Sequence, residues 1–136
     1  LKILDNYTLE QLNKIPEGFS NNLIWNAGHC LSVQQALVYK LSGLPGNISE
    51  EFMAKYKKGT KPEGDVSQDE VDEIKRLLLS TLQQVESDFE KGIFVNYMEY
   101  GTSIGYTLKN IEGALDFNNY HEGLHTGVMM SIKKFV

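Results

Sequence analysis

The fold class is decided by residues 67–89, SQDEVDEIKRLLLSTLQQVESDF. Apolar residues recur here at intervals of three and four, and charged or amide side chains occupy the opposite positions. Ser67 and Glu70 have the spacing of a capping box, in which each side chain bonds the other residue's backbone amide. The stretch therefore predicts an amphipathic helix that begins at Ser67 and ends before Gly92. The predicted apolar stripe consists of Val71, Ile74, Leu77, Leu78, Leu82, Val85 and Phe89.

A second helix is predicted before this stretch, from Ser20 or Asn21 to about Ser42. Either of the first two residues can cap it, and Gly43 and Pro45 end it because neither continues a helix well. Apolar residues cover much of its circumference, which is typical of a helix that packs on more than one neighbour.

The chain is expected to be one all-α domain over residues 1–136. Its last helix is predicted to span residues 107–134, and residues 47–56 are predicted to form a short helix before an exposed loop at 57–64. The opening residues look like the end of a helix, so we expect a first helix that is truncated at its N-terminus. No useful stretch alternates as strands do, which favours a bundle of four main helices.

Composition excludes several classes of function. The net charge is −5 and the 13 basic residues are scattered, so nucleic-acid binding is not expected. No apolar run is long enough to span a membrane. The single cysteine, Cys30, excludes an internal disulfide, and no secretory signal opens the sequence, so a cytoplasmic location is expected.

Three histidines are the strongest functional signal. His121 and His125 stand four residues apart on the last predicted helix, so their rings share one face, and that face also carries apolar residues. His29 lies on the other broadly apolar helix. Burial of imidazoles is costly unless each ring finds a partner. Three neutral imidazoles leave coordination positions open, as catalytic metal sites do, so the sequence predicts one divalent transition metal ion on these three residues.

Neighbouring residues are expected to line the same pocket. Trp25 and Asn26 lie within one helical turn of His29, and Phe117 and Asn118 lie within about one turn before His121. Residues in such positions are more often packing or outer hydrogen-bond partners than pocket lining. No catalytic residue beyond the metal ligands is assigned.

Two other interpretations remain open at this stage. A ring taken alone could be a core histidine bonded to a carbonyl. Residues 121–125 also have the His-Glu-x-x-His pattern of zinc hydrolases, with Glu122 as general base. Against this, only 11 residues follow His125 to supply a further ligand, and Glu122 projects about 100° away from His121 around the helix. For Cys30 we expect a buried, inert thiol rather than a nucleophile or ligand.

Four segments resemble the DinB-like superfamily of metal-binding helical bundles. The Trp-Asn-x-Gly-His block together with a late His-x-x-x-His is specific in combination and weak singly. The resemblance implies an up-down four-helix bundle with a long crossover, a metal ion on His29, His121 and His125, and often a homodimer. Nickel or zinc is the metal that it implies. The matching segments are TLEQLN at 8–13, FSNNLIWNAGH at 19–29, VYKLSGLP at 38–45 and NNYHEGLHTG at 118–127.

The resemblance also suggests a class of reaction. Characterised relatives include enzymes that use bacillithiol or mycothiol, as S-transferases or thiol-dependent isomerases, and many members have no assigned reaction. Despite the family name, it implies no polymerase or DNA-binding activity. We therefore hypothesise a metal-dependent transferase or hydrolase whose ion activates a thiol or water toward a small-molecule substrate. A metal-binding interaction module without catalysis is the alternative.

Overall fold

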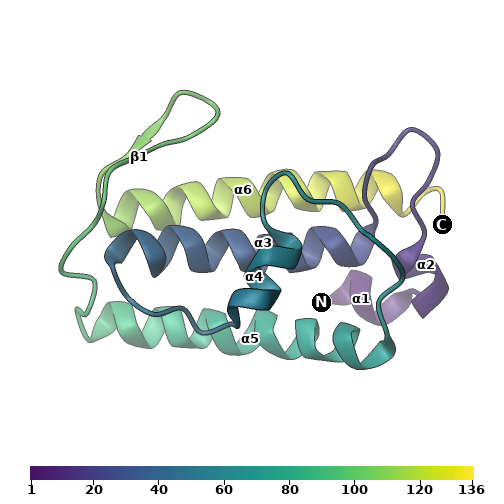
Figure 1. Cartoon of the computed structure of the whole chain (residues 1–136), viewed down its shortest axis with the longest axis horizontal. Coiled ribbons are helices and arrows are strands. Elements are labelled where there is room, and N and C mark those ends of the chain that lie inside the picture. The colour runs from purple at the N-terminus through teal and green to yellow at the C-terminus, as the bar shows by residue number, and fades with distance from the viewer.

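In the computed structural model, which describes residues 1–136, three long helices run side by side (Figure 1). They are α3 (Leu23–Val38), α5 (Gln68–Glu90) and α6 (Ile111–Ile132). Helix α3 lies between the other two, and 14 of its 16 residues are buried. This burial confirms the prediction of a helix that packs on more than one neighbour. The all-α fold class is confirmed as well.

Helix α3 is fixed at both ends by side-chain and backbone geometry. The Asn22 side chain caps it by accepting from the Trp25 backbone amide at 2.8 Å, and it also donates to the Asn13 carbonyl at 2.8 Å. The helix thus starts slightly later than predicted, because Asn22 is anchored by both bonds. It is followed by the 3-10 turn η1 (Lys40–Ser42), and Gly43, with φ 71°, ends the segment as expected.

Helix α5 begins at the predicted position. The Ser67 side chain accepts from the Glu70 backbone amide at 3.3 Å. The reciprocal half of the predicted capping box is wrong, because the Glu70 carboxylate bonds Lys55 at 2.6 and 2.7 Å and the Tyr56 hydroxyl at 2.5 Å. This carboxylate therefore ties α5 to the preceding short helix α4 (Glu50–Tyr56).

The buried face of α5 follows the predicted stripe in the first half of the helix and departs from it in the second half. Leu82 and Phe89 are 49% and 42% exposed, whereas Thr81 and Asp88 are buried. Asp88 is retained in the core because it accepts a hydrogen bond from the Tyr39 hydroxyl at 2.8 Å. A polar partner that lies far away in sequence thus decides which side of the helix faces inward.

Helix α6 is shorter than predicted. It begins at Ile111, because the Asn110 side chain accepts from the Gly113 backbone amide at 2.9 Å and caps it there. The preceding residues form strand β2 (Thr107–Leu108), which pairs antiparallel with β1 (Tyr100–Gly101) in a small projecting hairpin (Figure 1). The sequence did not predict this hairpin. Within α6, Leu124 is 50% exposed rather than part of a buried stripe.

The N-terminal segment forms two short helices, α1 (Lys2–Asn6) and α2 (Leu9–Asn13), at one end of the long ones (Figure 1). They pack on α3, and Leu4 and Leu12 are buried in the main core cluster. The four-helix bundle with a long crossover and the single-domain organisation stay predictions.

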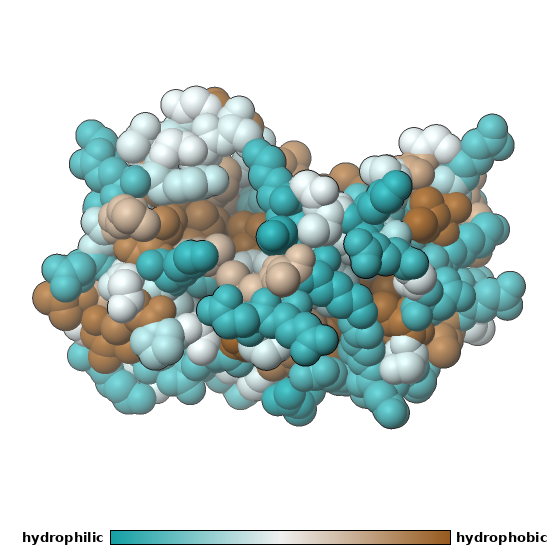
Figure 2. Space-filling model, viewed as in Figure 1, coloured by the Kyte–Doolittle hydropathy of each residue, from teal (hydrophilic) through white to brown (hydrophobic).

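The loop after α4 crosses α3 on the side that faces the viewer in Figure 1. It is polar and mostly exposed, as predicted for residues 57–64. On the same face, apolar atoms gather beneath the hairpin and at the opposite end (Figure 2). No helix in the chain combines the length and the apolar character that a bilayer crossing demands.

Candidate metal centre

The three histidines meet between α3 and α6. One ring nitrogen from each of His29, His121 and His125 lies within 4.8 Å of the others. The ring centroids are 4.5 to 5.2 Å apart. His29 is buried, and the other two are partly buried. The structure thus brings together the residues that the sequence singled out as ligands from two separate helices.

His29 is oriented by the end of α4. Its Nδ1 lies 2.7 Å from the backbone carbonyl oxygen of Tyr56. Because a carbonyl only accepts, Nδ1 must carry the proton, and the lone pair of the neutral ring is left on Nε2. The Tyr56 hydroxyl donates to Glu70, and the Tyr56 ring packs directly against Gly28. A Cβ at Gly28 would lie 2.6 Å from the ring, so only glycine leaves room for it.

His125 is oriented by Asn26. Its Nδ1 lies 2.7 Å from the Asn26 side-chain oxygen. The amide nitrogen of Asn26 donates to the Asn22 carbonyl at 2.7 Å and to the Asn21 side-chain oxygen at 2.9 Å, which fixes which end of the amide faces the ring. His125 therefore also carries its proton on Nδ1 and has a free lone pair on Nε2.

Only three buried side-chain nitrogen or oxygen atoms in the whole chain lack a hydrogen-bond partner. They are Trp25 Nε1, Asn118 Oδ1 and His121 Nδ1, and all belong to the histidine cluster or its immediate neighbours. Buried polar atoms are rarely left unpaired, because each costs free energy comparable with a lost hydrogen bond. The unpaired buried polar atoms of the chain are thus concentrated at the histidine cluster.

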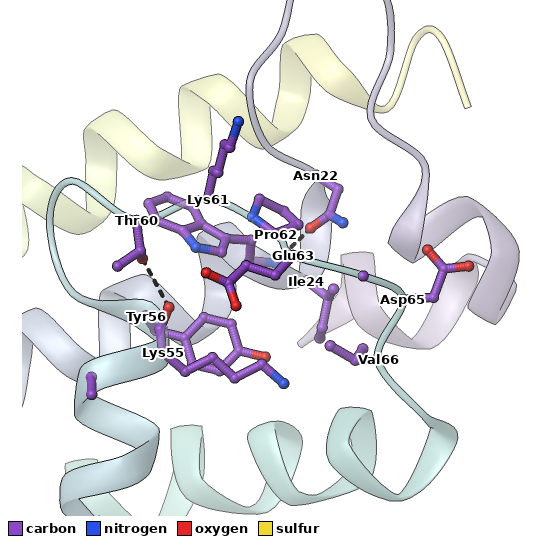
Figure 3. Close-up of a pocket in the computed structure, with 13 residues that line it drawn as sticks. Asn22, Ile24, Lys55, Tyr56, Thr60, Lys61, Pro62, Glu63, Asp65 and Val66 are labelled. Atoms are coloured by element: carbon purple, nitrogen blue, oxygen red, sulfur yellow. Dashed lines mark hydrogen bonds between the residues drawn. The ribbon is translucent and has the colours of Figure 1, made fainter.

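Trp25 joins the cluster to a cavity. Its indole ring stacks on His29 with centroids 4.7 Å apart and an interplanar angle of 10°. The same side chain lines a cavity of about 420 Å³ enclosed by α3, α4 and the 57–66 loop. In Figure 3 the Glu63 carboxylate lies on the side of Tyr56, whereas Lys61 extends away from it. None of the three histidines lines this cavity, so Trp25 lies between it and the histidine cluster.

The other residues singled out in the sequence make contacts within α6 or lie in the core. Asn118 is buried, and its side-chain amide nitrogen donates a hydrogen bond to the Glu122 carboxylate at 2.7 Å. The Phe117 ring packs against Tyr120, with centroids 5.8 Å apart. Cys30 is buried as expected, and burial together with the nearby Glu122 charge raises the pKa of its thiol to about 12.

Comparison with known proteins assigns the family. The family model described as the DinB superfamily matches residues 1–129. The chain belongs to the DinB superfamily. No curated protein matches it. Membership is compatible with metal binding, and the histidine cluster of this DinB-superfamily chain fits a metal site.

The sequence does not predict the two hydrogen-bond partners that orient the histidines of the DinB-superfamily site. The sequence predicts Asn26 in the pocket but not its contact with His125, which is 99 residues away, and it makes no prediction for Tyr56. The Tyr56 contact runs through a backbone oxygen, which leaves no side-chain signature in a sequence. Gly28, beside His29, was the one available signal of a close approach.

The DinB-superfamily histidines are neutral at physiological pH. Burial lowers the pKa of His121 and His125 to about 4. A smaller unfavourable charge effect comes from His125 and His29 in the case of His121, and from His29 alone in the case of His125. Burial also lowers the pKa of His29, despite the favourable bond to the Tyr56 carbonyl. Neutral imidazoles are the form that binds metal, so no proton has to be displaced from these rings.

The depressed pKa values predict that acid destabilises the metal-free protein. The ordinary histidine pKa of 6.5 describes the unfolded state, whereas His121 and His125 titrate near 4 in the folded state. Their contribution to stability is therefore fully present above pH 6.5 and is lost as the pH falls toward 4. Urea unfolding in the presence of chelator should show a lower free energy at pH about 5 than at pH about 7. The double variant His121→Gln/His125→Gln should show a weaker pH dependence, and parallel curves for the two proteins would contradict this assignment.

Proposed function

We propose that this chain is a metal-dependent enzyme that acts on a small molecule, with one divalent transition metal ion held by His29, His121 and His125. The observation that carries the proposal is the convergence of three neutral imidazoles from two helices, with ring nitrogens within 4.8 Å of one another. Two of these rings already use Nδ1 for an oxygen acceptor, so Nε2 is the atom available to an ion.

The donor set fits the ion. Nitrogens that share one tetrahedral ion at about 2.1 Å lie about 3.4 Å apart, so side-chain adjustments of about an ångström complete the site. Three imidazole nitrogens suit zinc, nickel and cobalt rather than magnesium or calcium, which prefer oxygen. We propose nickel or zinc as the natural ion.

An ion bound by three protein ligands retains open positions, where it lowers the pKa of a coordinated water or thiol. The chain's own residues supply the rest of the site. Tyr56 and Asn26 orient two ligand rings, and Trp25 shields one face of His29 from water. Cys30 is buried with a raised pKa, so a reacting thiol has to come from a separate molecule. On the family resemblance we propose a thiol-dependent S-transferase, with a related transferase or hydrolase as the wider class.

Cobalt substitution tests whether the site is open. Addition of a small thiol to the cobalt-loaded protein should change its visible absorption, because the thiol enters the coordination sphere. Trp25, the single tryptophan of the chain, stacks on His29, so its fluorescence reports metal loading independently. A spectrum that no thiol or other exogenous ligand alters would instead support the metal-binding interaction module, in which the ion only fastens α3 to α6.

A zinc hydrolase with Glu122 as general base is the second candidate, favoured only by the His-Glu-x-x-His pattern at 121–125. The Glu122 carboxylate accepts from Asn118 and is not part of the three-residue metal-ligating group. Glu122→Gln should abolish hydrolysis if the residue is a general base. In a thiol transferase the same variant should retain activity, because glutamine still accepts the Asn118 bond.

Assembly is a further proposal that rests on the family resemblance. We propose that each chain forms an up-down four-helix bundle with a long crossover and that two chains form a homodimer. A cytoplasmic location is also proposed, on the ground that the single cysteine forms no internal disulfide. Sedimentation of the metal-loaded protein measures the oligomeric state directly.

A further inference from the structure

Two of the three unpartnered buried atoms are complementary. Asn118 Oδ1 is a hydrogen-bond acceptor without a donor, and His121 Nδ1 is a ring nitrogen without a partner. The two residues are three positions apart on α6, so their side chains are neighbours on one face of the helix. Each residue could therefore satisfy the other's unpaired atom.

The orientation of Asn118 is already set by a carboxylate. Its amide nitrogen donates to Glu122 Oε1 at 2.7 Å, which leaves the amide oxygen as the free end. Glu122 follows one helical turn after Asn118 and one residue after His121, so all three belong to one turn of α6. The carboxylate polarises the amide and strengthens its oxygen as an acceptor.

Asn26 already forms the kind of contact to a histidine that Asn118 lacks. Its amide nitrogen donates to two oxygens, and its own oxygen lies 2.7 Å from His125 Nδ1. Asn118 has the same arrangement one helix away, with a donor bond on the nitrogen and a free oxygen beside a histidine. The histidine bond is the one element that Asn118 lacks.

We propose that Asn118 and Glu122 position His121 for the metal ion, through a hydrogen-bond chain from the Glu122 carboxylate to the Asn118 amide and from the Asn118 oxygen to the Nδ1–H of His121. The inference rests on the proposed metal site. Coordination through Nε2 requires a neutral ring with its proton on Nδ1, and this proton needs an acceptor in a buried place. Asn118 Oδ1 is the buried acceptor that has no other donor. Asn118 and Glu122 are thus positioning residues, and Glu122 is not a base.

Two variants of similar shape test the role of Asn118 in the full chain. Asn118→Asp, made together with Glu122→Gln so that the new carboxylate still receives a hydrogen bond from residue 122, keeps an acceptor beside His121, whereas Asn118→Leu removes it. Zinc affinity measured by competition with a chromophoric chelator should fall about 10- to 100-fold in the leucine variant and stay near the wild-type value in the aspartate variant. The cobalt absorption should shift in the leucine variant alone, because a loosely held ring changes the ligand field. Asn119→Ala, an exposed neighbour on the same helix, is the matched control and should behave as wild type.

Glu122 is tested through its dependence on Asn118. Glu122→Ala should weaken zinc binding several-fold in the wild-type background, yet add nothing in the Asn118→Leu background. Equal zinc affinities for the leucine and aspartate variants, or additive effects of the two substitutions, would overturn the proposed chain. If the wild-type protein itself binds neither zinc nor cobalt, the proposed function fails instead. Urea unfolding of the metal-free variants separates a loss of affinity from a loss of fold.

Discussion

Replacement of His29 by alanine should abolish stoichiometric metal binding. His121 and His125 alone offer two nitrogens from one helix, whereas a stable site of this kind takes at least three protein ligands. We expect affinity to fall by more than the roughly 100-fold that loss of an outer hydrogen-bond partner costs, because a ligand itself is removed. Metal analysis of untagged protein should give about one ion per wild-type chain and almost none for the variant.

Cys30→Ala is the matched control for this experiment. Cys30 adjoins His29 on α3 and is buried, but its thiol has a raised pKa and is not one of the three grouped ligands. The variant should load metal as wild type does. Equal, stoichiometric loading of His29→Ala and wild type would show that residue 29 is no ligand, and metal loss in the cysteine variant would point to the thiol instead.

Much of the fold could be predicted because local signals agree with long-range packing. The periodic stripe and the Ser67 cap predict α5, and the breadth of the apolar face predicts that α3 packs on more than one neighbour. The predictions were wrong where a distant polar group overrides the local pattern. Asp88 turns one side of α5 inward through Tyr39, although the stripe favoured Phe89 for that position. Such a bond spans 49 residues and leaves no periodic trace.

The sequence predicts the three candidate metal ligands but not the groups that orient their rings. The spacing of His121 and His125 on one helix is a local property, and a third histidine on another broadly apolar helix supplied the rest. The supports are contacts between distant segments, one of them a backbone carbonyl at Tyr56. Sequence patterns carry residue types and spacing, so they do not indicate which backbone oxygen will face a ring.

Substitution of Gly28 by alanine is expected to disturb both stability and the metal site. The new Cβ would lie 2.6 to 2.7 Å from three atoms of the Tyr56 ring, and Tyr56 is only 1% exposed, so the ring has to move. Overpacking of this kind costs about 1–3 kcal/mol, and the better helix propensity of alanine offsets at most about 1 kcal/mol of that. We expect a net loss of about 1–2 kcal/mol in the free energy of unfolding, measured in urea without metal.

Displacement of Tyr56 should also weaken metal binding, because the Tyr56 carbonyl oxygen orients the His29 ring. The Tyr56 carbonyl holds His29 Nδ1 at 2.7 Å, so a shift of the α4 end loosens a ligand ring without touching it. Zinc affinity should therefore fall about 10- to 100-fold in Gly28→Ala. Gly127→Ala on α6 is the matched control, because its Cβ would meet nothing within 4 Å. It should gain up to about 1 kcal/mol of stability and leave zinc affinity unchanged. If Gly28→Ala lost stability but bound zinc as tightly as the control, the Tyr56 carbonyl would support the fold and not the metal site.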